Sequence, residues 1–192
     1  MSAEKITGIV LAGGQGRRMG GVDKGLQPLG GKAMVAHVIA RLAPQVDAIV
    51  INANQNLESY AKLGFPVVPD VTGGFAGPLA GLQAGLQAAK TALVVTAPCD
   101  SPFLPLDLVA RLRAAMDGKD LAVAKTGTQA HPVFAIVRRE ILDHLTAYLT
   151  SGGRKIDAWY ASLKVVEVAF DDQRDAFSNI NTREELRAHE EI

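Results

Sequence analysis

The sequence predicts an α/β fold with a doubly wound, mostly parallel sheet and helices on both faces, in one domain over residues 1–192. Apolar runs typical of buried strands alternate with segments of helical periodicity, and the connections between them are short. The first apolar run leads directly into a glycine-rich stretch. Since ligands of such sheets bind beyond the carboxyl ends of the strands, we expect the functional residues in the loops that follow strands.

Short runs of mostly β-branched and other apolar residues predict the strands, and they are expected over 6–11, 48–51, 66–68, 92–96, 121–124, 133–137 and 165–168. The first helix is predicted by an apolar stripe at helical spacing, formed by Met34, Val35, Val38, Ile39 and Leu42. The other helices are expected over 56–63, 78–90, from Pro105 to Met116, from Ile141 to Leu149, and as a charged segment at the C-terminus.

Composition excludes several classes of protein. Apolar residues make up 48% and charged residues 21%, which is ordinary for a globular chain and excludes intrinsic disorder. Basic and acidic residues balance at 20 each, so a nucleic-acid or membrane partner is not expected. Cys99, the single cysteine, excludes an internal disulfide. Without an apolar run of about 18 residues or a signal peptide, we expect a cytoplasmic protein.

The glycine-rich stretch, residues 13–25, suits a polyphosphate. Six of its thirteen residues are glycine, and Arg17, Arg18 and Lys24 accompany a single acid, Asp23. Glycines let backbone N–H groups approach a ligand closely, and cations beside such a nest of amides attract phosphates. A surface loop with solvated charges is the alternative.

This loop matches neither of the two common nucleotide motifs. Met19 stands where the third glycine of a dinucleotide fingerprint belongs. A P-loop read through Lys32 would need glycine at Leu26 and Ser or Thr at Ala33. The sequence therefore indicates a phosphate-binding loop of another kind.

Two carboxylates follow predicted strands. Asp100 comes just after the most apolar strand, where a carboxylate can hold Mg²⁺ against phosphate oxygens, although Asp-Ser-Pro is also a good turn. Asp70 ends another strand, and helix capping is its alternative role. Cys99 is interpreted as a small buried residue rather than a nucleophile.

The segment Leu11-Ala12-Gly13-Gly14-x-x-x-Arg18-Met19-Gly20-Gly21-x-Asp23-Lys24 resembles the signature of the nucleotidyltransferases, and most closely that of the molybdenum cofactor guanylyltransferase family. Three later blocks, in the same order as in the family, support the resemblance: Asp70 with 77–81, then 98–100, then 179–182.

The resemblance implies transfer of GMP from GTP to the terminal phosphate of molybdenum-molybdopterin, with Mg²⁺ as cofactor and release of pyrophosphate. It implies catalytic roles for Lys24, Arg18 and Asp100, with Asp100 also the metal ligand. The nucleotide-binding residues that it implies are Leu11, Ala12, Gly13, Gly14, Lys24, Asn52, Asp70, Gly77, Pro78 and Asp100.

The C-terminal part is expected to bind the pterin acceptor, through Asn179 and Asn181, while the N-terminal part binds nucleotide. Asn181 also fits the entry to the last helix, and Asn52 also fits an ordinary turn. His131 could line the acceptor side, although structural roles are expected for all four histidines. Other molybdenum cofactor biosynthesis proteins and recipient molybdoenzymes are the implied protein partners.

Three alternatives remain open at this point. The cytidylyl and the sugar-phosphate nucleotidyltransferases share the plan of the loop, although Gly13-Gly14 after Ala12 favours guanine, since cytidylyl relatives tend to have Ala-Ala-Gly there. A nucleotide-binding regulatory module without transfer chemistry is the third.

Overall fold

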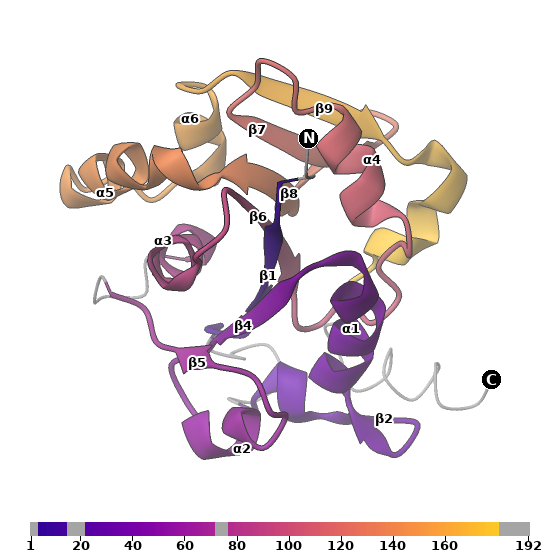
Figure 1. The fold of residues 1–192 in the computed structure, drawn as a ribbon. Coiled ribbons are helices and arrows are strands. Elements are labelled where there is room, and N and C mark those ends of the chain that lie inside the picture. The colour runs from indigo at the N-terminus through magenta and orange to yellow at the C-terminus, as the bar shows by residue number, and fades with distance from the viewer. Residues whose placement is uncertain (1–3, 15–21, 72–76, 181–192) are drawn as a thin grey trace.

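The structure, a computed structural model, describes residues 4–14, 22–71 and 77–180 (Figure 1). At its centre is a seven-stranded sheet. In spatial order its strands are β5 (Val67–Val68), β4 (Ala48–Asn52), β1 (Ile6–Leu11), β6 (Leu93–Pro98), β8 (Gln129–Arg138), β7 (Leu121–Thr126) and β9 (Val165–Ala169).

The sheet is mostly parallel, as predicted. β5, β4, β1 and β6 pair in parallel, and β7 pairs in parallel with β9. β8 is antiparallel to both of its neighbours, β6 and β7. The other six strands therefore all point the same way, and their carboxyl ends lie along one edge of the sheet.

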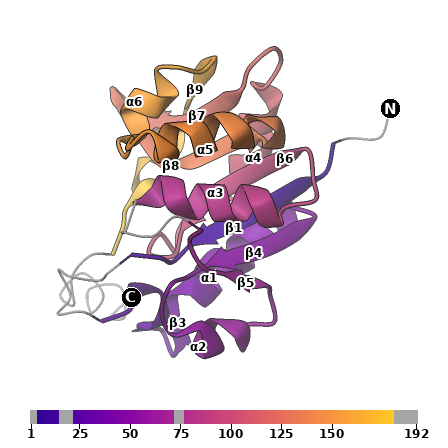
Figure 2. The ribbon, with the colours of Figure 1, turned by 90° about the vertical axis from the view of Figure 1, so that its left-hand side faces the viewer.

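Helices cover both faces, which confirms the doubly wound architecture (Figures 1 and 2). α1 (Met34–Leu42) and α4 (Leu108–Ala114) pack on one face, and α2 (Leu57–Ala61) contributes Tyr60 to the same core. α3 (Pro78–Ala88), α5 (Leu142–Thr150) and α6 (Ile156–Tyr160) pack on the other. Strand side chains alternate between the faces, so that Val10 joins the first core and its neighbour Ile9 the second.

Of two helices predicted from apolar periodicity, the first is confirmed and the second starts later than predicted. The five apolar residues of the predicted first stripe are all buried in α1, which confirms it. The prediction that Pro105 opens the next helix is wrong. α4 begins at Leu108, because Asp107 has a non-helical backbone and Pro105 instead opens a turn, in which its carbonyl accepts the Leu108 N–H. Met116 lies beyond the end of α4.

Several elements were not predicted. β7 and β8 form a hairpin through the two-residue connection Gly127–Thr128, where Gly127 has a positive φ of 56°. β2 (Pro28–Leu29) and β3 (Lys32–Ala33) form a second hairpin. Single helical turns, η2 (Lys24–Leu26), η3 (Ala43–Gln45) and η4 (Arg139–Ile141), and the longer η5 (Asp171–Phe177) complete the order of elements. The charged helix expected at the C-terminus lies outside the described residues.

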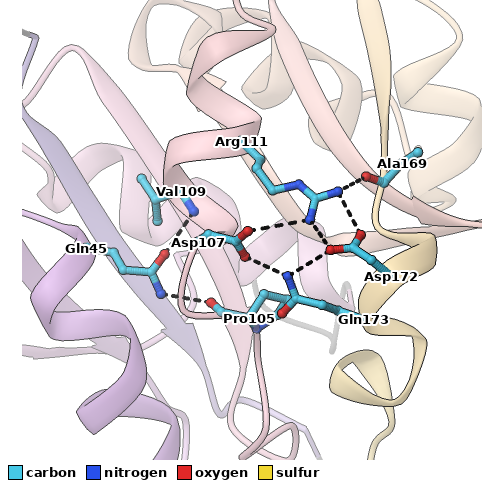
Figure 3. Close-up of polar contacts among 8 residues, drawn as sticks. All are labelled: Gln45, Pro105, Asp107, Val109, Arg111, Ala169, Asp172 and Gln173. Carbon is cyan, nitrogen blue, oxygen red and sulfur yellow. Dashed lines mark hydrogen bonds and ion pairs between the residues drawn. The ribbon is translucent and has the colours of Figure 1, made fainter.

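Arg111 of α4 fastens η5 to the body of the domain (Figure 3). Its two terminal nitrogens contact the two carboxylate oxygens of Asp172 at 3.0 Å each, and one of them also donates to the Ala169 carbonyl. The guanidinium carbon lies 4.0 Å from the centre of the Phe170 ring. A planar cation that is both paired and stacked holds one orientation, so the start of η5 is fixed.

A neighbouring set of amide contacts continues this attachment toward α1 (Figure 3). Gln173 Nε2 donates to Asp107 Oδ1 at 2.9 Å, which joins η5 to the start of α4. Gln45 accepts the Val109 N–H at 3.0 Å and donates to the Pro105 carbonyl at 2.9 Å. After η5 the chain reaches the loop that follows β6, where the Ile180 N–H donates to the Asp100 carbonyl at 2.9 Å.

Within the described ranges, none of the helices has the length and apolar character needed to cross a membrane.

Candidate active site

The polar residues predicted from the sequence meet at the edge where the parallel strands end. β1 ends at Leu11, β4 at Asn52 and β6 at Pro98, and Asp70 follows β5. Backbone hydrogen bonds extend the pairing past the strand ends: Ala12 N–H donates to the Asn52 carbonyl at 2.7 Å, and Cys99 N–H to the Leu11 carbonyl at 3.0 Å. The predicted loop after β1 therefore starts between the loops that follow β4 and β6.

Asp70 binds two asparagine side chains. Asn52 Nδ2 donates to Asp70 Oδ1 at 2.9 Å, and Asn54 Nδ2 donates to Asp70 Oδ2 at 3.0 Å. In return, the Asp70 N–H donates to Asn54 Oδ1 at 2.8 Å. The structure thus joins the predicted residues Asn52 and Asp70 and adds Asn54, which the sequence analysis missed. The spacing of two residues between the asparagines was the available signal, since it places both on one side of an extended chain.

Two glycines let the backbone approach these asparagines closely. A Cβ placed on Gly81 of α3 would lie 2.4 Å from Asn52 Oδ1, and one on Gly13 would lie 2.8 Å from Asn54 Nδ2. Any side chain at either position would therefore displace an asparagine. α3 starts beside this cluster, with Gly77 as its N-cap at φ 68° and Pro78 as its first residue. The positive end of the α3 dipole faces the same edge, where it favours an anionic ligand.

A lysine and a carboxylate face each other at the centre of the edge. Lys24 Nζ, from η2, lies 3.3 Å from Asp100 Oδ2, after β6. Their side chains are only 19% and 14% exposed, so the two opposite charges interact with little screening by water. Both predicted catalytic residues that the structure describes are therefore in contact.

Asp100 fits one Mg²⁺ that a nucleotide helps to coordinate. Mg²⁺ in phosphate-transfer sites is bound through one or two carboxylates, and phosphate oxygens and water fill its other positions. Within residues 4–14, 22–71 and 77–180, no three His, Cys, Asp or Glu side chains gather to hold a metal by themselves. The donor set therefore suits a metal that binds together with a triphosphate.

An open pocket of about 760 Å³ lies at the same edge, between the β7–β8 hairpin and the segment after η5. Its walls are polar residues and two rings, and they comprise Thr126, Gly127, Thr128, Gln129, His131, Arg174, Phe177, Ser178 and Asn179. The pocket adjoins Asp100, since Asn179 Oδ1 lies 2.5 Å from the hydroxyl of Ser101. Asn179, which the resemblance assigns to the acceptor, and His131 both line this pocket.

His131 is fixed in the wall of this pocket. Its ring stacks on Phe177 with 4.7 Å between centroids and 11° between planes, and its Nε2 lies 2.7 Å from the Thr126 hydroxyl. Burial lowers the pKa of His131, because a charged imidazolium loses hydration there. A neutral, stacked ring gives the pocket a flat wall.

Cys99 is buried, and its burial raises the pKa of the thiol. It therefore stays protonated at neutral pH, which agrees with its interpretation as a packing residue. Two further predicted site residues, Arg18 and Asn181, lie outside the residues that the structure describes.

Comparison with known proteins gives one family. The model of the MobA-like NTP transferase domain matches residues 8–166. A molybdenum cofactor guanylyltransferase of Cupriavidus necator is 54% identical, over 99% of this chain and 98% of the relative. Another of Burkholderia vietnamiensis is also 54% identical, over 95% of this chain and 94% of its own.

Solved structures agree with the fold. The molybdopterin-guanine dinucleotide biosynthesis protein A of Archaeoglobus fulgidus superposes with a TM-score of 0.79 at 27% identity, covering 96% of this chain and 97% of its own. The 4-diphosphocytidyl-2C-methyl-D-erythritol synthase of Anaerococcus prevotii has a TM-score of 0.72 at 15% identity, covering 98% of this chain and 97% of its own. At that identity the second likeness shows the fold alone.

Proposed function

The chain belongs to the MobA-like NTP transferases, and among them to the molybdenum cofactor guanylyltransferases, and on this basis we propose a role for each residue of the site. It is a nucleotidyltransferase that forms the guanine dinucleotide form of the molybdenum cofactor. Its substrates are GTP and molybdenum-molybdopterin, and pyrophosphate is the other product.

GTP binds, we propose, across the ends of β1, β4 and β5 and the start of α3. Leu11 to Gly14 and the Gly77–Pro78 turn supply backbone at this edge, and the Asn52–Asp70 pair supplies fixed polar groups for the nucleoside. Arg18, by its place in the motif, is assigned to the phosphates. This arrangement is supported by one observation above all: the Asn52–Asp70 pair and the Lys24–Asp100 pair lie at the same edge.

The reaction needs no covalent enzyme intermediate. The acceptor phosphate is already a nucleophile, so the protein has to place it in line with the α-phosphate of GTP and compensate developing charge. Lys24 compensates negative charge on the departing pyrophosphate, and Asp100, which contacts Lys24 in this structure, would hold the metal. Mg²⁺, when bound, supplies charge neutralisation on the triphosphate oxygens.

The acceptor binds, in this proposal, in the pocket beside Asp100. A pterin carries hydrogen-bond donors and acceptors on a flat ring, and the pocket offers hydroxyl and amide groups beside the stacked rings of His131 and Phe177. Asn179 lies between this pocket and Asp100 through its contact with Ser101. The N-terminal part of the domain thus serves the nucleotide and the C-terminal part the acceptor. A cytoplasmic location and contacts with recipient molybdoenzymes stay predictions.

Pyrophosphate release with molybdenum-loaded molybdopterin tests this assignment. With Mg²⁺, we expect release with GTP and not with CTP at equal concentration. Asn179→Ala should raise the KM for molybdopterin about tenfold, the cost of one hydrogen bond to a charged or strongly polar group, and leave the KM for GTP unchanged. Release with CTP alone would contradict guanylyl transfer, and an unchanged molybdopterin KM would remove Asn179 from the acceptor site.

A further inference from the structure

Three consecutive residues at the start of η2 are held from three different directions. Asp23 is bound by α2 and the residue before it, Lys24 contacts Asp100, and Gly25 is packed against buried side chains. Only Lys24 among them has a proposed part in the reaction. The contacts of Asp23 and Gly25, on either side of Lys24, therefore call for an explanation of their own.

Both carboxylate oxygens of Asp23 are bound, one by Tyr60 of α2 and the other by Asn56, the residue before that helix. Tyr60 donates its hydroxyl to Asp23 Oδ1 at 2.5 Å, and Asn56 Nδ2 donates to Asp23 Oδ2 at 3.0 Å. Tyr60 is fully buried, and burial raises its pKa, so its hydroxyl keeps the proton that it donates. The one acid of the glycine-rich stretch is thereby directed toward α2.

Gly25 rests on the same tyrosine. A Cβ at this position would lie 2.6 Å from the Tyr60 oxygen and 3.2 Å from Cys99 Sγ. Since Tyr60 and Cys99 are both buried, the backbone of η2 sits against rigid groups on that side. The turn is therefore fixed in position on both sides of Lys24.

We propose that Tyr60 and Asp23 are positioning residues for Lys24: through the Tyr60–Asp23 hydrogen bond they hold η2 where the Lys24 ammonium reaches the Asp100 carboxylate and the triphosphate. Neither touches the reacting atoms. The inference rests on the proposed function of Lys24. A long, flexible lysine side chain is useful for transition-state stabilisation only if its backbone is held, because a displacement of about 1 Å at a catalytic group costs about 10²-fold in rate.

Tyr60→Phe tests the inference, since it removes only the hydroxyl. We expect kcat for pyrophosphate release to fall about 10- to 100-fold, with the KM for molybdopterin unchanged, at a temperature where circular dichroism shows the variant folded. Tyr148→Phe is the matched control: its hydroxyl donates to the Lys155 carbonyl, away from the site, and its kcat should equal that of the parent. A Tyr60→Phe protein with parental kcat would overturn the inference.

A double-mutant cycle separates positioning from a merely structural role. If Tyr60 acts through Lys24, adding Tyr60→Phe to Lys24→Ala should cost less than about twofold further. The same 10- to 100-fold loss in both backgrounds would overturn the inference while leaving Lys24 in its role. A Lys24→Ala protein with parental kcat would instead refute the proposed site itself.

Asn56→Gly provides a second variant should Tyr60→Phe fold poorly. Asn56 has a left-handed backbone, with φ 51°, which glycine adopts without strain, and its contact with Asp23 is exposed. Loss of this weaker contact should lower kcat about two- to fivefold in the parent and not at all in Lys24→Ala. Equal kcat for the parent and Asn56→Gly would overturn the inference.

Discussion

The ammonium of Lys24 and the carboxylate of Asp100 lie 3.3 Å apart although 76 residues separate them in the chain. Each side chain is largely shielded from water, so each compensates the other's charge. In the proposed site, Lys24 would contact phosphate and Asp100 would hold Mg²⁺ in place of this contact. Substitution of Lys24 or Asp100 by a neutral residue would remove this ion pair and leave the remaining side chain charged.

Lys24→Ala should reduce turnover much more than stability. We expect kcat to fall about 10²- to 10³-fold, the usual cost of deleting one group that stabilises charge in the transition state. Steady-state pyrophosphate release measures this loss. Lys90→Ala, which removes an exposed lysine before β6, is the control and should keep parental kcat. A folded Lys24→Ala protein with normal turnover would contradict the assignment.

Asp100→Asn should alter the dependence on Mg²⁺. An amide keeps the size of the side chain but lacks the negative charge that attracts the metal, so the Mg²⁺ concentration for half-maximal activity should rise about tenfold or more. Titration with MgCl₂ at saturating GTP measures it, and Asp117→Asn, an exposed substitution, serves as control. Coincident titrations of Asp100→Asn and the parent would show that Asp100 does not hold the metal.

Gly81→Ala should weaken GTP binding selectively. Its Cβ would lie 2.4 Å from Asn52 Oδ1, so Asn52 must move and the Asn52–Asp70 pair must change. A rise of about tenfold in the KM for GTP corresponds to about 1.4 kcal/mol. Gly85→Ala on the same helix would contact Ile9 instead and should lower stability by about 1–3 kcal/mol with the KM for GTP unchanged. Equal KM values for Gly81→Ala and Gly85→Ala would refute the role of Asn52.

His131 should make stability depend on pH below neutrality. Burial lowers its pKa in the folded state below the ordinary value of 6.5, so the unfolded chain takes up the proton first. Its contribution is therefore fully present above about pH 6.5 and is lost as the pH falls from there toward the folded-state pKa. Urea unfolding of the parent and of His131→Gln at about pH 7.5 and 5.5 measures the two slopes. The parent should lose more stability than the variant, and parallel slopes would contradict this origin.

Arg111→Lys should loosen η5 and, through it, the acceptor pocket. Lysine keeps the charge but loses the bidentate contact with Asp172 and the stacking on Phe170. Because Asp172 is well exposed, we expect only a small loss in the free energy of unfolding. The KM for molybdopterin should rise while that for GTP stays constant. Arg113→Lys on the same helix is the control, and identical molybdopterin KM values would contradict the link between η5 and the pocket.

The meeting of several candidate site residues at one sheet edge could be predicted because these residues follow strands. Asn52, Asp70 and Asp100 each come directly after an apolar run, and the rule that strand ends meet at one edge brings them together without coordinates. The apolar stripe of α1 was equally clear from the spacing of its residues. Lys24 required the resemblance, since a charged residue in a glycine-rich loop has no periodicity that locates it.

The remaining part of the site depends on pairings between distant segments. The reversal of β8 follows from a two-residue connection at Gly127–Thr128, which apolar periodicity does not distinguish from a break between parallel strands. Phe177 of η5 stacks on His131 although 46 positions separate them, and such a contact leaves no local pattern in the sequence. Tyr60 looked like an ordinary residue of a polar helix, although its hydroxyl binds Asp23.

The reversed direction of β8 brings the start of a strand, and not the end of one, to this edge of the sheet. Gly13 and Asp70 follow the carboxyl ends of β1 and β5, outside the strands themselves. Beside the pocket, by contrast, Gln129 and His131 are strand residues, already paired with Thr126 and Ala124 of β7. The backbone of Gln129 and His131 is held by strand pairing, and their side chains lie on the same side of the strand. A relative with a different acceptor would therefore be expected to differ at these positions by single side-chain substitutions and not by loop length.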